Sequence, residues 1–235
     1  MTEREKILGR IREALRVAAP RPGDHGDHGY QDDPAHSPVR KPTPTADMRR
    51  WLPAVGDSFA DRAAAFAAQS LDLRTEFHLV ENQEAAQAKL RDVARECGWT
   101  RIATHRTPLT DPACAALGLP TLYTDTSYAA PDLEKCDVGI SECDALIAQT
   151  GSVLITTRSA GGRALSVLPP HHVVLVRREQ LLPDLPAAFA LLKEKYGTSY
   201  PSFMSLITGP SRTGDIERIL VLGAHGPKKL TIICF

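Results

Sequence analysis

The stretch FHLVENQEAAQAKLRDVARECGWTRIATH, residues 77–105, decides the fold because a strand, a helix and a second strand follow one another in it. FHLV at 77–80 is a short run of strand-forming residues. The following segment has Asn82 where a helix N-cap is expected, apolar residues at helical spacing, and Gly98 where the helix ends. RIATH at 101–105 has the pattern of a short buried strand. A strand–helix–strand unit of this length predicts parallel strands with a helix packed on the sheet.

The same alternation extends in both directions from this unit. After about residue 136 the predicted strands follow one another more closely, and residues 146–148 suit either a helix or a strand. We therefore predict an α/β protein with an open, largely parallel sheet and helices on both faces, in three layers. The further predicted helices are 58–70, 111–119 and 182–197, and the further strands are 122–124, 152–157, 171–178, 203–208, 218–223 and 229–235.

Composition excludes two classes of partner. The 235 residues contain 28 Lys and Arg against 28 Asp and Glu, and only 6% are aromatic. A nucleic-acid binder would need a basic field or stacking aromatic side chains, so nucleic acid is not expected as a partner. No apolar stretch approaches the roughly 18 residues of a membrane span. The charged start MTEREKILGRIREALRV has no apolar signal core, which predicts a cytoplasmic location.

Three segments are predicted along the chain. Residues 1–19 form an amphipathic helix, with Ile7 and Leu8 on its apolar face. Residues 20–44 are rich in Pro, Gly, His and Asp and form a flexible linker. Its histidines and aspartates would bind a divalent metal only weakly, or they serve as solvated sequence. The α/β domain covers residues 45–235.

The cysteines are spread too widely to hold a metal cluster. No C-x-x-C pair occurs, so neither zinc nor iron–sulfur spacing is present, and we expect buried, reduced thiols. Cys143 lies between Glu142 and Asp144, whose charges disfavour its thiolate. The chain is therefore expected to hold no metal and no cofactor of its own. The five cysteines are Cys97, Cys114, Cys136, Cys143 and Cys234.

Four segments in the C-terminal half together resemble the LUD-domain family of lactate utilization proteins. They are AQTGSVLIT (148–156), SVLPPHHVVLV (166–176), PSFMSLITGPSRTGDIE (201–217) and LVLGAHGPKKLTIIC (220–234). The resemblance implies a fold like that of the sugar-phosphate isomerases, coenzyme A transferases and 5-formyltetrahydrofolate cyclo-ligase. It also implies a component without clusters that acts with iron–sulfur partner proteins in oxidising L-lactate to pyruvate.

Two other functions remain open. The first is a stand-alone enzyme of isomerase, transferase or cyclo-ligase type, acting on a phosphorylated or coenzyme A-linked substrate. The second is a pure assembly module. The chain contains no Walker A loop, G-x-G-x-x-G or G-x-S-x-G motif, so nucleotide hydrolysis, dinucleotide binding and serine hydrolase chemistry lose support.

The loop in ITGPSRTGDIE, residues 207–217, is the first candidate for a ligand site. Gly209 and Pro210 would expose backbone N–H groups, and Ser211, Arg212 and Thr213 would add donors around a small carboxylate or phosphate. Ligands of open α/β sheets bind outside the carboxyl ends of the strands, where we expect this loop to lie.

A purely structural role for the same loop is the alternative. Asp215 would then cap a helix and Arg212 would pair with Glu217. Asp215 and Glu217 are otherwise candidates for catalysis, together with His225 and Glu142. Glu142 could serve as a nucleophile, but we expect it to form a solvated acidic turn with Asp144.

Three more segments carry candidate ligand-binding residues. In GAHGP, Gly223 and Gly226 would allow close approach of a ligand and His225 could carry a proton; the alternative is a hairpin with an exposed histidine. In TRSAGGR, Arg158 and Arg163 could clamp an acidic group, or the loop is a mobile hairpin tip.

Thr150 and Gly151 would contact the ligand, or they form only a tight turn. His171 and His172 are neighbours on a predicted strand, so only one of them is expected to face inward, and a shared metal is not expected.

Overall fold

The computed structural model describes residues 52–214, 220–222 and 225–235. The predicted N-terminal helix (1–19), the linker (20–44) and the start of the domain near residue 45 lie outside these ranges. None of the helices in the described ranges is long and apolar enough to cross a membrane.

The strand–helix–strand unit forms as the sequence predicts. The Asn82 side chain accepts a hydrogen bond from the Ala85 N–H at 2.9 Å, and Gly98 ends the helix in the left-handed conformation, with φ 65°. The preceding helix begins at Ser58, whose hydroxyl caps it in a capping box with Asp61. These elements are α2 (Phe59–Leu73), β1 (Glu76–Leu79), α3 (Gln83–Cys97) and β2 (Ile102–Thr104).

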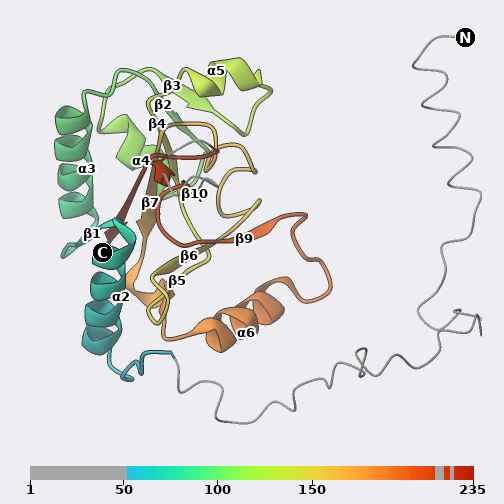
Figure 1. Ribbon diagram of the computed structural model, residues 1–235. Coiled ribbons are helices and arrows are strands. Elements are labelled where there is room, and N and C mark those ends of the chain that lie inside the picture. The colour runs from blue at the N-terminus through green and yellow to red at the C-terminus, as the bar shows by residue number, and fades with distance from the viewer. Residues whose placement is uncertain (1–51, 215–219, 223–224) are drawn as a thin grey trace, which may run out of the picture. The chain divides into compact units, whose positions relative to one another are not determined.

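Six parallel strands build the main sheet, in the order β1-β12-β7-β4-β2-β3. Helices α3 and α4 cover one face, where Leu90, Val93 and Ala113 pack on Val173 and Ile233. The prediction of an α/β protein with a parallel sheet flanked by helices is thus confirmed (Figure 1). The remaining elements of this layer are α4 (Thr110–Ala115), β3 (Thr121–Tyr123), α5 (Ala130–Glu134), β4 (Val138–Ser141), β7 (His171–Val176) and β12 (Lys229–Cys234).

The closely spaced strands of the second half form a separate sheet of four strands, in the order β8-β5-β6-β9. The β5–β6 and β6–β9 pairs are antiparallel, and β5–β8 is parallel. Helix α6 (Leu185–Tyr196) covers the outer face through Ala188 and Leu192. The strands are β5 (Ala145–Ile147), β6 (Ser152–Thr156), β8 (Leu181–Leu182) and β9 (Met204–Ile207), and the short 3-10 helix η2 (Arg178–Gln180) precedes β8.

The largest core lies between the two sheets. Val174 and Ile232 of the parallel sheet pack with Leu146 and Ile155 of the second sheet, and Phe66 of α2 closes the same layer. The second face of the parallel sheet is therefore covered by α2 and the second sheet, and at β2 by α5, whose Leu133 packs with Ala103.

Strand β7 is consequently buried on both faces. His171 and His172 are 4% and 1% exposed, so the expectation that only one of them faces inward was wrong. Their side chains do alternate, but each face of this central strand meets a packed layer.

The loop after β9 leads into a short antiparallel ribbon of β10 (Arg212–Gly214) and β11 (Leu220–Leu222). Asp215, Glu217 and Gly223 fall outside the described residues, as does the helix cap predicted at Asp215.

Candidate functional site

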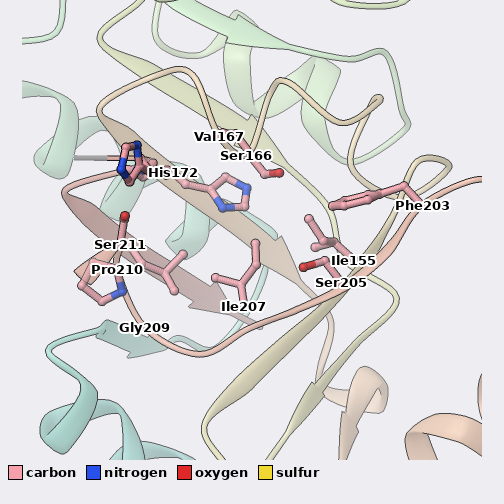
Figure 2. A pocket seen from close by; sticks show the side chains of 14 residues that line it. Ile155, Ser166, Val167, His172, Phe203, Ser205, Ile207, Gly209, Pro210 and Ser211 are labelled. Atoms are coloured by element: carbon pink, nitrogen blue, oxygen red, sulfur yellow. The ribbon is translucent and has the colours of Figure 1, made fainter. Parts of the chain in front are cut away.

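A cavity of about 150 Å³ lies between the two sheets, beside the amino ends of β7 and β12 (Figure 2). Two of the predicted loops, GPS and HGP, meet at its wall, where the Ser211 N–H donates a hydrogen bond to the Pro227 carbonyl at 2.9 Å. Five of the predicted ligand-binding residues line it, namely Gly209, Pro210, Ser211, His225 and Gly226. The other lining residues include His172, Ser166, Ser205, Ile155, Phe203, Ile207 and Leu230.

We expected the GPS loop to lie at the carboxyl ends of the parallel strands, but it does not lie there. It follows β9, which belongs to the second sheet, and it comes to rest beside the segment that leads into β12. That segment is itself held at the amino end of β7, since the Lys228 N–H donates to the Pro170 carbonyl at 2.8 Å. The rule for carboxyl ends applies to strands of the parallel sheet, and β9 is not one of them.

His172 and Ser166 are the buried polar residues among the described lining of this cavity. The Nε2 atom of His172 lies 2.8 Å from the Ser141 hydroxyl, which in turn donates to the Glu142 carbonyl at 3.0 Å. Burial, reinforced by the charge of neighbouring His171, lowers the pKa of His172 to about 3, so the ring is neutral at pH 7. Its Nδ1 is buried and has no hydrogen-bond partner among the described residues.

The glycines of the two loops are required by close packing. Gly209 has φ 84°, and a Cβ there would lie 2.9 Å from the Leu73 carbonyl oxygen. A Cβ on Gly226 would lie 3.2 Å from the Cβ of Ser211. The wall of the cavity therefore leaves little room for added side chains at these positions.

Arg212 is exposed and donates to the carbonyl of Leu73, at the end of α2. It does not line the cavity. Thr213 belongs to β10, and its side chain falls outside the described part of the chain.

Thr150 and Gly151 form a tight turn that packs on α2. Gly151 has φ 64°, and a Cβ there would lie 2.7 Å from the Cβ of Gln69. The hydroxyls of Thr150 and Ser152 lie 2.8 Å apart. The Ser152 hydroxyl also lies 2.8 Å from the hydroxyl of Thr208. The structure thus places this turn in the packing between β6, β9 and α2.

Arg158 and Arg163 contact different residues of the segment that follows α6. Arg158 donates to the Ser199 carbonyl and lies over the ring of Tyr196. Arg163 donates to the Ser202 carbonyl at 3.0 Å, and its guanidinium lies 5.7 Å from the centroid of the Phe203 ring. Both arginines therefore fasten this segment, and neither lines the cavity.

We expected the acidic turn at 142–144 to be solvated, but its Asp144 is buried. Asp144 is 3% exposed, and its carboxylate accepts hydrogen bonds from Lys195, Tyr196 and Ser159, each at 2.6 Å. Burial alone would raise the pKa of Asp144, but these donors and the Lys195 charge bring it below its ordinary value.

Glu142 and Cys143, which precede Asp144, contact other parts of the protein than its carboxylate does. Glu142 follows β4 and accepts from the Thr107 hydroxyl, away from the cavity lining. Cys143 is buried, and burial together with the charge of Asp144 raises the pKa of its thiol well above the ordinary value, in the direction predicted.

Sequence reasoning missed three polar residues of the cavity lining, His172, Ser166 and Ser205, along with its apolar residues. His172 was weighed only as a metal ligand. The signal that could have identified it is the polar pair at the start of a strand that is otherwise fully apolar, because a buried histidine needs a partner.

Comparisons with known proteins agree with this architecture. The family model of the LUD domain matches residues 124–234. The lactate utilization protein C of Geobacillus kaustophilus is 30% identical over 228 residues, covering 89% of this chain and 92% of that protein. The protein of the same name from Geobacillus thermodenitrificans is 29% identical, covering 78% of this chain and 82% of its own.

A solved structure shows a similar fold. A DUF162 family protein from Deinococcus radiodurans superposes with a TM-score of 0.60 and 22% identity, covering 76% of this chain and 99% of that one. Since the lactate utilization protein C of Geobacillus kaustophilus is 30% identical and matches over 89% of this chain, the protein belongs to the LUD-domain family, in its lactate utilization protein C branch.

Proposed function

We propose that this protein is a component of a lactate-oxidising system and that it binds a small 2-hydroxy or 2-oxo acid in the His172 cavity. The name shared by its relatives supports the metabolic role. The observation that carries the ligand is the cavity itself, a small and mostly apolar space lined by His172 and by the GPS and HGP loops.

The size of the cavity favours a small acid. A cavity of about 150 Å³ in another protein holds benzene, and lactate has the same number of non-hydrogen atoms. Pockets for larger small molecules usually measure roughly 300–1,000 Å³, and the cavity reaches that range only together with the adjoining hollow of about 450 Å³. The stand-alone isomerase or transferase is therefore the weaker alternative.

The lining has an apolar interior, and Ile155, Phe203 and Leu230 would contact the methyl group of the acid. An adjoining hollow shares His225 with the cavity and adds one cation, Lys228, and one carboxylate, Glu134. The carboxylate of the acid is proposed to lie beside Lys228. Such an ion pair would fix the orientation of the acid in the cavity.

The electron-carrying clusters are proposed to reside on iron–sulfur partner proteins. The cysteines of this chain are separated in sequence, and burial raises the pKa of Cys114 and Cys234 to about 11. Because a cluster ligand must be a thiolate, these thiols are poor ligands.

Isothermal titration of the full-length protein with L-lactate and pyruvate tests the ligand. Lys228→Ala should weaken binding of the acid roughly threefold to tenfold by removing the cation beside the carboxylate. Lys229→Ala is the matched control, because its ammonium lies 3.7 Å from the Cys97 sulfur and not in the lining.

The same titration includes ribose 5-phosphate and acetyl-coenzyme A. Tighter binding of either than of the small acids would favour the stand-alone enzyme. Equal losses in the two lysine variants, or no binding of any acid, would contradict the proposed site.

A further inference from the structure

Strand β9 is the last strand of the second sheet, and its outer edge has no neighbouring strand in the described part of the chain. Its pairing with β6 is regular from Met204 to Ile207, without a bulge. The carbonyl of Phe203, just before the strand, accepts from the Thr157 N–H at 3.1 Å and so points toward β6. Because backbone groups alternate along a strand, those of Met204 and Leu206 point away from β6, along the open edge.

This edge lacks the features that usually protect an edge strand from pairing. Residues 201–210, PSFMSLITGP, contain no charged residue, and both prolines lie outside β9. An apolar groove runs between the strand and α6, and the helix contributes Leu185, Ala188, Phe189 and Leu192 to its lining. Met204, Leu206 and Phe189 are 44%, 41% and 61% exposed. An uncharged, apolar edge of this kind is a template for another strand.

We propose that the occupant of this edge is strand β9 of a second copy of the chain, paired antiparallel about a two-fold axis through Ser205. Two-fold dimers are the commonest soluble oligomers, and each copy in such a dimer presents the same surface. In this register Met204 of each copy lies opposite Leu206 of the other, and their outward N–H and C=O groups bond to one another. The second sheets of the two copies become one continuous sheet.

The neighbouring registers satisfy fewer backbone groups. A shift in one direction pairs Leu206 with Ser202, whose carbonyl already accepts a hydrogen bond from Arg163. A shift in the other direction pairs Met204 with Thr208, which lies beyond the end of β9. Only the axis through Ser205 uses both outward-facing residues of the strand.

The charges of the edge also favour a second copy as the occupant. No charged side chain is among the described residues that line the groove. A partner surface of mixed charge would lose the hydration of its charged groups there without gaining an opposite charge. The β9 strand of a second copy brings no charge, and its own exposed Met204 and Leu206 are covered in return.

Pairing at Ser205 also joins the cavities of the two copies along one face of the sheet. Phe203, Ser205 and Ile207 line the cavity, on the face of β9 opposite to Met204 and Leu206. In the proposed register, Phe203 of one copy lies opposite Ile207 of the other, so the second copy extends the cavity wall. The pairing needs no ligand, and its failure would leave the proposed acid site standing.

Sedimentation of the full-length protein over a roughly hundredfold range of concentration tests the dimer, since assembly follows mass action. The double variant Met204→Lys/Leu206→Lys places like charges opposite each other, and Met204→Lys/Leu206→Glu places opposite charges there. The dissociation constant of the first should exceed that of the second by about tenfold. Leu71→Lys is the control, because Leu71 is 80% exposed on α2 and does not line the groove. It should dimerise like the unmodified protein.

A cysteine at the axis tests the register without adding charge. The two Ser205 residues form a non-hydrogen-bonded antiparallel pair, whose Cα atoms are expected about 4.5 Å apart, within the range of a disulfide. Ser205→Cys should therefore form a linked dimer on mild oxidation. Ser202→Cys is the matched control, since the two copies of this exposed residue would lie about 20 Å apart. The unmodified protein measures any cross-linking by the native cysteines.

A protein that is monomeric at every concentration overturns the inference. Equal dissociation of the two double variants also overturns it, as does a dimer that Ser205→Cys does not cross-link, because another surface or register then joins the copies.

Discussion

Two buried polar regions of this protein differ in how their polar atoms are satisfied. The Asp144 cluster, formed with Ser159, Lys195 and Tyr196, has a hydrogen-bond donor of its own chain on each carboxylate oxygen. The His172 cavity has one ring nitrogen bonded to Ser141 and the other unpartnered among the described residues. A buried polar group that the fold satisfies stabilises the fold, and one that is left without a partner lowers the stability.

The largest effect is expected from breaking the satisfied cluster. Asp144→Ala should lower the free energy of unfolding by about 3 kcal/mol, because it leaves a buried tyrosine hydroxyl and the Lys195 ammonium without their acceptor. Urea titration of the protein measures this loss. The control is Asp132→Ala, whose carboxylate pairs with Lys135 at the surface and should change stability by less than about 0.5 kcal/mol. Equal losses in both variants would refute the structural role of Asp144.

The Gly151 turn gives the next effect. Gly151→Ala should destabilise the protein by about 2 kcal/mol, since φ is positive and the added Cβ would meet α2. Gly98→Ala tests the backbone conformation alone, because no atom lies within 4 Å of its added Cβ, and about 1 kcal/mol is expected. Thermal unfolding compares the two. If folded Gly151→Ala binds the small acids more weakly, the turn at Thr150 and Gly151 contributes to the ligand site.

On acidification, His172 and Asp144 should begin to lower the stability of the protein at different pH values. The folded pKa of His172 lies below its unfolded value, so the unfolded chain takes up the proton first and stability falls from about pH 6.5 downward. The folded pKa of Asp144 is also lowered, but its contribution is present above the unfolded value of about 3.9 and is lost only below it.

Denaturation curves across this pH range test the order of the two losses. His172→Gln should flatten the dependence between pH 6.5 and about 3, and Asp144→Asn should flatten it only below about pH 4. An unchanged slope above pH 4 in His172→Gln, or a changed one there in Asp144→Asn, would contradict the assignment.

The smallest effect is expected at the two arginines of TRSAGGR. Arg158 and Arg163 contact the segment after α6 at the protein surface, so replacing either with Ala should cost less than about 1 kcal/mol. Affinity for the small acids should not change, as calorimetry can show. A loss of affinity of tenfold or more would support the anion clamp that the sequence suggested.

The first half of the fold could be predicted because its signals are local. Ser58, Asn82 and Gly98 mark helix ends by short-range hydrogen bonds and backbone conformation, and the structure confirms the elements that they bound. The second sheet could not be separated from the first in the same way. Strands such as β6 and β9 show where an extended segment lies, but their hydrogen-bond partners are distant in sequence.

The candidate site was predictable only in part, for the same reason. The composition of the GPS and HGP segments predicts turns, and both segments line the same cavity in the structure. The environment of Asp144 could not be foreseen, because Lys195 and Tyr196 lie some fifty positions away along the chain.

By itself, the sequence determined the α/β class, the capped ends of α3 and the loops in which ligand-binding residues could lie, because capping, turn formation and hydrophobic periodicity act over a few residues. It did not predict α5, and it extended the 111–119 helix beyond Ala115, where α4 ends. Only the tertiary structure decided which strands share a sheet, that both histidines of β7 are buried, and that Asp144 is satisfied while His172 is not. These outcomes depend on contacts between segments far apart in the chain, and burial and hydrogen bonding of a side chain are set by those contacts.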